Sequence, residues 1–159
     1  MKAPQLQQRG FSLIELVVVT VILGILAIII IPRLSTGADK TMKAETTAYK
    51  IVTDLRRTRQ LAISKAIEEG GGEQRVELRF LESEPYTKYI IMDNRTQPDD
   101  TILETVIIDP DVSITGPWIM EFNGDGTLVG TTPEIITVSG GTGTFAITVN
   151  LNGYISISP

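Results

Sequence analysis

Two residue types with strong chemistry are missing from this chain of 159 residues. It has no cysteine, so it can form neither a disulfide bond nor a reactive thiolate. It also has no histidine, the side chain most often used as a general base or a metal ligand. No nucleophile lies beside a base in the sequence. We therefore predict that the chain is not an enzyme and that it binds no cofactor or metal.

Basic residues are also in the minority. The chain has 14 Lys and Arg residues against 19 Asp and Glu residues, a net charge of −5. An acidic balance argues against a general nucleic-acid-binding surface. The length is sufficient for one domain and a membrane anchor.

A long apolar run is the strongest feature that is present. Residues 11–31 contain one charged side chain, Glu15. A helix needs about 20 apolar residues to cross a bilayer core about 30 Å thick. The run is too long for a secretory signal peptide, and no A-x-A-like site follows it. We therefore predict a retained membrane-spanning helix over residues 11–32.

Glu15 is the unusual residue of this run. An ionised side chain costs roughly 2.5–3.5 kcal/mol at the centre of a membrane, so it usually has a partner. No basic side chain lies within one helical turn, since Arg9 precedes Glu15 by six residues. The carboxylate either snorkels to the interface or meets an amine created by cleavage after Gly10. Such a cleavage would place an ammonium on Phe11, about one turn away, where it could face the Glu15 of a neighbouring copy.

The string RGFSLIE, at residues 9–15, is followed by the apolar helix and Pro32. It resembles the class III signal of type IV pilins and type II secretion pseudopilins. The resemblance implies that residues 1–10 are a leader, and that a prepilin peptidase cuts between Gly10 and Phe11 and methylates Phe11. It also implies that Glu15 supports assembly and that the helix bends or partly melts near Pro32 in a filament.

The resemblance also implies an orientation. Prepilin peptidases cut on the cytoplasmic face, so the N-terminus would be cytoplasmic and the chain would cross the inner membrane once. The body of the chain would then be periplasmic. Removing the leader removes two basic residues, which leaves 12 basic against 19 acidic residues and a net charge of −7.

Residues 33–69 are predicted to continue the helix as an amphipathic segment. Small and apolar residues recur there at spacings of three and four, which favours packing of one narrow stripe on a globular domain. The stripe contains Ala44, Ala48, Ile51, Val52, Leu55, Thr58, Ala62 and Ala66. The sequence EEGGG, at residues 68–72, predicts the end of the helix.

Residues 73–159 are predicted to form a β-rich globular domain. The pattern changes to alternating β-branched residues, which predicts strands at 75–81, 86–92, 102–108, 118–122, 135–139, 144–150 and 154–157. Phe145, Ile147 and Val149 should share one face. Asparagine–glycine turns are expected at 123–126 and 152–153. The fold class is therefore α+β, a long N-terminal transmembrane helix packed on one antiparallel sheet, as in the type IV pilin fold.

Three segments narrow the resemblance. They are DLRRTRQLAIS at 54–64, EFNGDGTLVG at 121–130 and TFAITVNLNGYISI at 144–157. Their order resembles the GspH/FimT family of minor pseudopilins and minor pilins. DNA-binding members of that family carry a basic motif after the last turn glycine. Here that place is GYIS, at 153–156, without arginine, so nucleic-acid binding is not expected. The chain also lacks the C-terminal disulfide of many type IV pilins.

Several polar groups allow two interpretations. Asn123, Asp125 and Thr127 alternate around glycines as in a calcium loop, with Glu134 at the twelfth position, but the other ligands are missing and a plain β-turn is expected. Four loop acids could hold a cation, although solvated carboxylates are favoured: Asp99, Asp100, Asp109 and Asp111. Four basic residues could contact DNA, although a solvated face meeting a neighbouring acidic subunit is favoured: Arg56, Arg57, Arg59 and Lys65. Trp118 is expected in the sheet core.

Together these features favour a structural minor pseudopilin of a type II secretion system. Its expected partners are the prepilin peptidase, other pseudopilin subunits and the inner-membrane assembly platform, and its expected product is a periplasmic pseudopilus for protein secretion. The alternatives are a FimT-like minor type IV pilin in pilus assembly or DNA uptake, and an anchored β-domain whose signal match is accidental.

Overall fold

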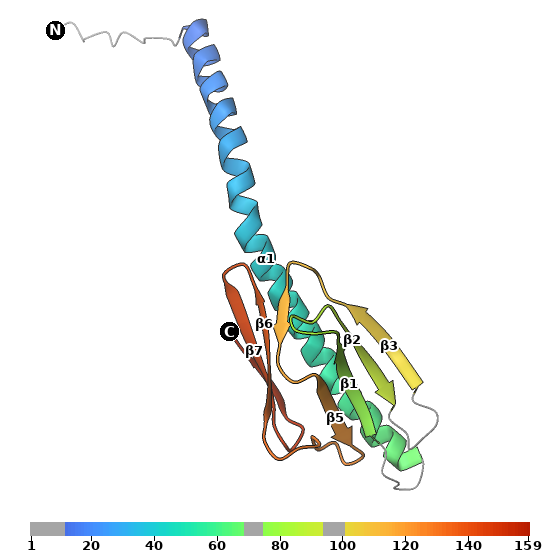
Figure 1. Cartoon of the computed structure of the whole chain (residues 1–159). Coiled ribbons are helices and arrows are strands. Elements are labelled where there is room, and N and C mark those ends of the chain that lie inside the picture. The colour runs from blue at the N-terminus through green and yellow to red at the C-terminus, as the bar shows by residue number, and fades with distance from the viewer. Residues whose placement is uncertain (1–11, 69–74, 94–100) are drawn as a thin grey trace, which may run out of the picture. The chain divides into compact units, whose positions relative to one another are not determined.

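The structure of the chain is a computed structural model that describes residues 12–68, 75–93 and 101–159, without the side chains of residues 28–36. These residues form one helix, α1 (Leu13–Glu68), and eight strands (Figure 1). The chain divides into two compact units, Met1–Thr36 and Gly37–Pro159. Helix α1 belongs to both units, and its last residue, Glu68, opens the glycine-containing segment 68–72.

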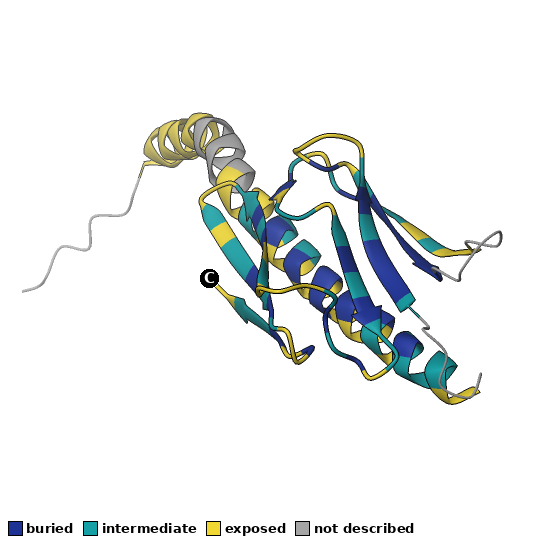
Figure 2. Cartoon of the chain, turned by 60° about the horizontal axis from the view of Figure 1, so that its bottom comes forward, coloured by how far each residue is buried: buried dark blue, intermediate teal, exposed yellow. Residues whose placement is uncertain are grey.

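The part of α1 in the second unit buries the predicted stripe. Ala44, Ala48, Ile51, Leu55 and Ala62 have no exposed surface, because they face the strands. Figure 2 shows these buried residues along one side of the helix and exposed residues along the other. The small alanines bring the helix backbone close to the strands, which is the packing that the spacing of three and four predicts.

The strands form two antiparallel four-stranded sheets. The first has the order β3-β2-β1-β5, and the second has the order β4-β6-β7-β8. The strands of the first sheet are β1 (Arg75–Leu81), β2 (Lys88–Asp93), β3 (Thr101–Ile107) and β5 (Ile119–Asn123). Those of the second are β4 (Ser113–Thr115), β6 (Glu134–Gly140), β7 (Gly143–Val149) and β8 (Ile155–Ser158).

The prediction of one sheet is therefore wrong, and the prediction of seven strands missed β4. Strand β4 has three residues, too few to show an alternating pattern. The chain leaves the first sheet after β3, pairs β4 with β6 in the second sheet, and returns to pair β5 with β1. Alternation of residue types indicates where a strand lies but not which strand is its partner, so the sequence could not predict this crossover.

One hydrophobic core joins α1 to both sheets. The first sheet contributes Leu78, Met120 and Phe122, and the second contributes Ile136 and Ile147, all without exposed surface. Phe145, Ile147 and Val149 face this core from β7, as predicted, although Phe145 is half-buried. The predicted arrangement of a helix packed on antiparallel strands is confirmed.

Two glycine turns hold the C-terminal strands against α1. Gly126 and Gly153 have φ angles of 80° and 74°, which favour glycine. An added Cβ at Gly153 would lie 2.0 Å from the carbonyl oxygen of Gly126 and 2.5 Å from Nε of Arg59. Arg59 Nε donates a hydrogen bond to that same oxygen at 2.8 Å. The two predicted turns therefore meet at one side chain of the helix.

Trp118 is not in the sheet core, contrary to the prediction. Its residue is 57% exposed, and it lies just before β5. The backbone bends at residues 116 and 118, so the alternation of β5 does not extend back to the indole. The Arg79 guanidinium carbon lies 5.6 Å from the ring centroid, a cation–π contact on the surface.

Candidate functional site

The candidate site is the N-terminal segment of α1. Gly10 and Phe11 lie outside the described residues. The helix begins directly after Ser12, whose carbonyl oxygen accepts hydrogen bonds from the backbone N–H groups of Glu15 (3.0 Å) and Leu16 (3.2 Å). Glu15 therefore lies in the first turn, where a negative side chain is favoured by the helix dipole. Ser12 and Glu15 have the spacing of a capping box.

The helix surface that follows is apolar and uncovered. Between residues 13 and 26, the large apolar residues are 46–80% exposed. Exposed apolar area of this extent indicates a surface that contacts lipid or another protein. Among the residues that the structure describes, no helix is both long and apolar enough to cross a membrane.

Pro32 lies within α1, and the helix is assigned without interruption through Gly24 and Gly37. A proline inside a helix removes one backbone donor and usually kinks the helix. The side chain of Pro32 lies outside the described set, so the structure does not test its predicted role in assembly.

Four charged residues tie the beginning of the second unit together. Lys43 Nζ lies 2.8 Å from Asp111 and 3.3 Å from Asp109, and Lys40 Nζ lies 3.1 Å from Asp111. Hydrogen bonding to Asp111 and then Asp109 raises the pKa of Lys43 above its usual value. The bonds from Lys43 and Lys40 lower the pKa of Asp111. The segment between β3 and β4 is thereby fastened to α1.

The turn between β6 and β7 contacts the same part of the helix. Thr41 Oγ1 accepts a hydrogen bond from the backbone N–H of Thr142 at 3.3 Å. The same hydroxyl lies 3.3 Å from the carbonyl oxygen of Gly140 and 3.1 Å from that of Gly37, and its one proton can be donated to either. An added Cβ at Gly140 would lie 2.7 Å from the carbonyl oxygen of Lys40. Only a glycine permits this approach of the turn to the helix backbone.

A buried hydrogen bond links α1 to the first sheet. The Tyr89 hydroxyl donates to Oδ2 of Asp54 at 2.5 Å, and Tyr89 is 1% and Asp54 6% exposed. Lys50 Nζ lies 3.4 Å from the same oxygen. Burial, followed by the bond to Asp54, raises the pKa of Tyr89, so the phenol stays protonated and remains a donor.

The basic cluster is only partly the solvated face that the sequence favoured, since Arg56 and Arg57 are exposed and Arg59 and Lys65 are half-buried. Arg57 pairs with Glu104 of β3, and Lys65 pairs with the buried Asp93 of β2. Arg59 is bound to the Gly126 carbonyl oxygen. Three of the four cations thus act within the chain, holding α1 against the sheets. Arg56 is exposed.

Several of the acids that were candidate cation ligands are bound to other groups of the chain. Asp125 Oδ1 accepts hydrogen bonds from the backbone N–H and the hydroxyl of Thr127, at 2.9 and 2.6 Å, so residues 123–127 form the predicted turn. These bonds lower the pKa of Asp125. Asp109 and Asp111 are paired with lysines rather than solvated. Asp99 and Asp100 lie outside the described residues. Over residues 12–68, 75–93 and 101–159, no cluster of three or more acids could hold a metal ion.

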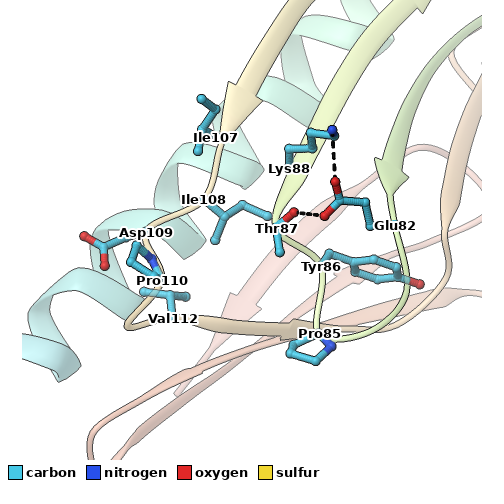
Figure 3. Close-up of a pocket in the computed structure, with 10 residues that line it drawn as sticks. All are labelled: Glu82, Pro85, Tyr86, Thr87, Lys88, Ile107, Ile108, Asp109, Pro110 and Val112. Carbon is cyan, nitrogen blue, oxygen red and sulfur yellow. Dashed lines mark hydrogen bonds and ion pairs between the residues drawn. The ribbon is translucent and has the colours of Figure 1, made fainter.

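An apolar cleft of about 520 Å³ lies between the end of β3 and the start of β2. Figure 3 shows Ile107 and Ile108 on one side of it and Tyr86 on the other. Glu82 accepts a hydrogen bond from Thr87 and pairs with Lys88 at 3.0 Å, two contacts that lower the pKa of Glu82. The Tyr86 ring stacks on Phe80 with centroids 4.8 Å apart.

Sequence reasoning found the N-terminal segment but missed the contacts that fasten α1. The sequence indicated no partner for Thr41, Lys43 or Tyr89, because their partners are 35–101 residues away in the chain. One usable signal was the placement of Lys40 and Lys43 beside the helix stripe, together with Asp109 and Asp111 in a later loop. Charge complementarity alone did not say which of several acids they would meet.

The comparisons with known proteins agree with this site. Residues 6–31 match the prokaryotic N-terminal methylation motif. That match includes Gly10, Phe11 and Glu15. No curated protein matches the sequence.

Two solved structures have a similar fold. The type IV minor pilin FimU of Pseudomonas aeruginosa is similar with a TM-score of 0.59 and 15% identity, over 72% of this chain and 92% of FimU. The minor pseudopilin EpsH from the type 2 secretion system of Vibrio cholerae is similar with a TM-score of 0.54 and 11% identity, over 73% of this chain and 96% of EpsH.

These findings define the class of the protein. The chain carries a prepilin-type methylation motif and has the type IV pilin fold. Its structural neighbours are a pilus subunit and a secretion pseudopilin, which share this fold at low sequence identity.

Proposed function

We propose that this chain is a structural minor subunit of a pilin-like filament. The observation that carries the proposal is the presence, in one chain, of the methylation motif at 6–31 and of a pilin-like helix packed on antiparallel sheets. The leader of residues 1–10 is removed, Phe11 becomes the methylated N-terminus, and residues 11–32 span the inner membrane. The folded unit that follows is periplasmic.

The exposed apolar surface of α1 supports packing in the filament core. Its apolar side chains have no cover from the described residues of their own unit, and a bilayer or neighbouring helices would supply it. Glu15 stands in the first turn of this surface. In the filament it offsets the ammonium of a neighbouring Phe11, a charge pair whose attraction grows as water is excluded. Pro32 lets the helix bend or locally unwind as the subunits pack.

Processing can be tested with the intact chain. Co-expression with a prepilin peptidase should give a protein that begins at Phe11 and carries one added methyl group, measured by mass spectrometry. Gly10→Ala should block cleavage. Gly24→Ala is the matched control, because an added Cβ there has nothing within 4 Å. A normal methylated Phe11 in the Gly10→Ala variant would refute the proposed cleavage site.

The system served by the filament is a further step. We assign the chain to the pseudopilus of a type II secretion system, as an H-type minor pseudopilin. The assignment is based on the order of the segments at 54–64, 121–130 and 144–157 and on the similarity to EpsH. A minor type IV pilin is the second candidate, supported by the similarity to FimU. Deletion of the gene in the host separates the two. Loss of protein secretion with normal piliation supports the first, and loss of surface pili with normal secretion supports the second.

A nucleic-acid role is not proposed. A DNA-uptake pilin needs cations that are available to phosphates. Here Arg57 and Lys65 are paired with Glu104 and Asp93 of the same chain. A gel shift with linear duplex DNA should therefore show no retarded band at physiological salt.

A further inference from the structure

Strand β3 leaves one side of the first sheet open. Strand β2 pairs with one of its edges, and no strand that the structure describes pairs with the other. An open edge exposes backbone N–H and C=O groups that can bind a further strand, so proteins usually protect it with lysine, proline or a short length. Strand β3 has seven residues, TILETVI, without lysine or proline. It therefore lacks these three forms of protection and carries only a bulge and one acidic side chain, Glu104.

The other three sheet edges are short or covered. Strand β4 has three residues and β8 has four. The outer side of β5 is occupied by the segment that follows it, since Val129 N donates to the Glu121 carbonyl oxygen at 2.8 Å and Leu128 bridges Phe122. The open edge of β3 is therefore an exception within the described residues rather than a general property of the domain.

The side chains of β3 also suit contact with another strand. Ile107 is 83% exposed, Ile102 58% and Leu103 39%. The pairing of β3 with β2 shifts between Ile91 and Met92, and this bulge leaves Leu103 without an opposite residue in β2. Ile107 also lines the apolar cleft beside Tyr86 (Figure 3). A strand added along β3 would therefore lie next to the cleft at one end.

The charge of β3 indicates the chemistry of the added strand. The one charged side chain of β3 is Glu104, at its centre. Its Oε2 pairs with Arg57 of α1, and a carboxylate can accept a second cation through its other oxygen. A second copy of β3, paired antiparallel about its middle, would place Glu104 opposite Glu104, and like charges directly opposite destabilise a sheet. A lysine or arginine at that position would instead be attracted to the carboxylate. The acidic chain, with a net charge of −5, disfavours its own copies in the same way.

We propose that the open edge of β3 is a binding site for an extended segment of a different protein. The segment adds a strand to the sheet, has apolar residues on both sides of a basic residue opposite Glu104, and places an apolar side chain in the cleft beyond Ile107. Main-chain hydrogen bonds supply affinity in such a complex, and the side-chain positions supply specificity. This role does not depend on the proposed function, since it uses the second unit alone.

The test uses the full chain in detergent micelles and labelled heptapeptides, with binding measured by fluorescence anisotropy. The first peptide is residues 101–107 with Glu104→Lys, and the second is the unaltered sequence. In an antiparallel complex centred on residue 104, the first places lysine opposite Glu104. We expect it to bind about fivefold more tightly than the second, the ratio typical of exchanging a like for an opposite charge across two strands.

Amide methylation tests the backbone contacts without changing the protein. Successive N–H groups of a strand point to opposite sides, so an added strand uses alternate amides only. Two further lysine peptides carry N-methyl groups, one at positions 103 and 105 and the other at 102 and 104. One methylated peptide should lose binding and the other should keep it. Equal loss or equal retention in both would overturn strand addition.

Variants of the protein locate the site. Ile107→Lys should weaken binding of the lysine peptide at least fivefold, because it introduces a charge beside the peptide and removes an apolar wall of the cleft. Ile135→Lys is the matched control on β6 of the other sheet, where Ile135 is 53% exposed, and it should leave binding unchanged. Equal weakening by both variants would overturn the location.

Two other outcomes also count against the proposal. A complex with a binding free energy of about −4 kcal/mol has a dissociation constant of about 1 mM and would be detected at that protein concentration. Absence of binding by the lysine peptide at about 1 mM protein would therefore overturn the site itself. The second outcome concerns the oligomeric state, which is measured by sedimentation of the full chain in micelles. A dimer that Ile107→Lys dissociates and Ile135→Lys does not would make a second copy the occupant, and would overturn the assignment to a different protein.

Discussion

The junction at Gly153 offers a sharp test of how the C-terminal strands are held on α1. In the variant Gly153→Ala, the new Cβ would lie 2.0 Å from the Gly126 carbonyl oxygen and 2.5 Å from Arg59 Nε. Neither group can withdraw easily, because Gly126 itself has little space: a Cβ there would be 2.7 Å from Ile63 Cδ1. The turn must open or the arginine must leave.

Two costs add in this variant. Holding a residue with a side chain at a φ of 74° costs about 1–2 kcal/mol. Loss of the 2.8 Å hydrogen bond from Arg59 to the Gly126 oxygen costs about 1.5–3 kcal/mol, because the donor is charged. We therefore expect the free energy of unfolding of the folded unit to fall by about 2.5–5 kcal/mol.

Urea unfolding of the full chain in micelles, followed by far-ultraviolet circular dichroism, measures this change. Gly130→Ala is the control, because its Cβ would meet only the Thr132 carbonyl oxygen, at 3.8 Å, and its backbone needs no positive φ. We expect the control to stay within about 0.5 kcal/mol of the unaltered chain. A loss below about 1 kcal/mol for Gly153→Ala, relative to this control, would refute the packing argument.

Three further predictions follow from other contacts. Glu15→Gln should leave membrane insertion intact but reduce incorporation into filaments, measured by shearing and immunoblotting, and normal incorporation would count against pairing with Phe11. Tyr89→Phe should lower the free energy of unfolding by about 1.5–3 kcal/mol, because Asp54 loses a buried donor, and an unchanged urea midpoint would contradict that role. Because the lysines lower the pKa of Asp111 in the folded chain, its ion pairs stabilise the fold above about pH 4 and lose their effect as pH falls through that lowered pKa. The difference in melting temperature between the unaltered chain and Asp111→Asn should therefore be constant at neutral pH and shrink below about pH 4, and a difference that grew in acid would contradict the ion pairs.

The helix was the most predictable element. Its stripe repeats at spacings of three and four over more than twenty residues, and seven of its eight members are buried. A pattern of that length has few alternative interpretations, because a strand would alternate the same residues between two faces. The strand from Arg75 to Leu81 was predicted with the observed bounds for a similar reason, since polar and apolar residues alternate from Arg75 to Phe80.

The pairing of the strands and the partners of the charged side chains could not be predicted in the same way. Strand β4 shows no alternation over three residues, and its partner β6 lies beyond β5 in the sequence. Arg57 and Lys65 look solvated on a helix drawn alone. In the folded chain they pair with Glu104 of β3 and Asp93 of β2, and these partners depend on how the helix packs on the first sheet.

The processing and assembly residues are a different case. The motif around Gly10, Phe11 and Glu15 could be recognised from the sequence, because a carboxylate in an apolar run needs a charged partner and none lies nearby in the chain. No contact within the described chain supplies such a partner, whereas the lysines that pair with Asp111 and the buried Asp54 find their partners within the second unit. A charged residue whose partner belongs to another molecule can therefore be recognised because its own chain supplies no opposite charge.

The two fastenings at the start of the second unit have a mechanical consequence. Thr41 joins α1 to the turn between β6 and β7, and Lys40 and Lys43 join it to the segment between β3 and β4. Tension applied to the N-terminal part of α1 would enter the folded unit at these contacts and divide between the two sheets. A force along α1 would thereby be shared by several strands instead of acting on one.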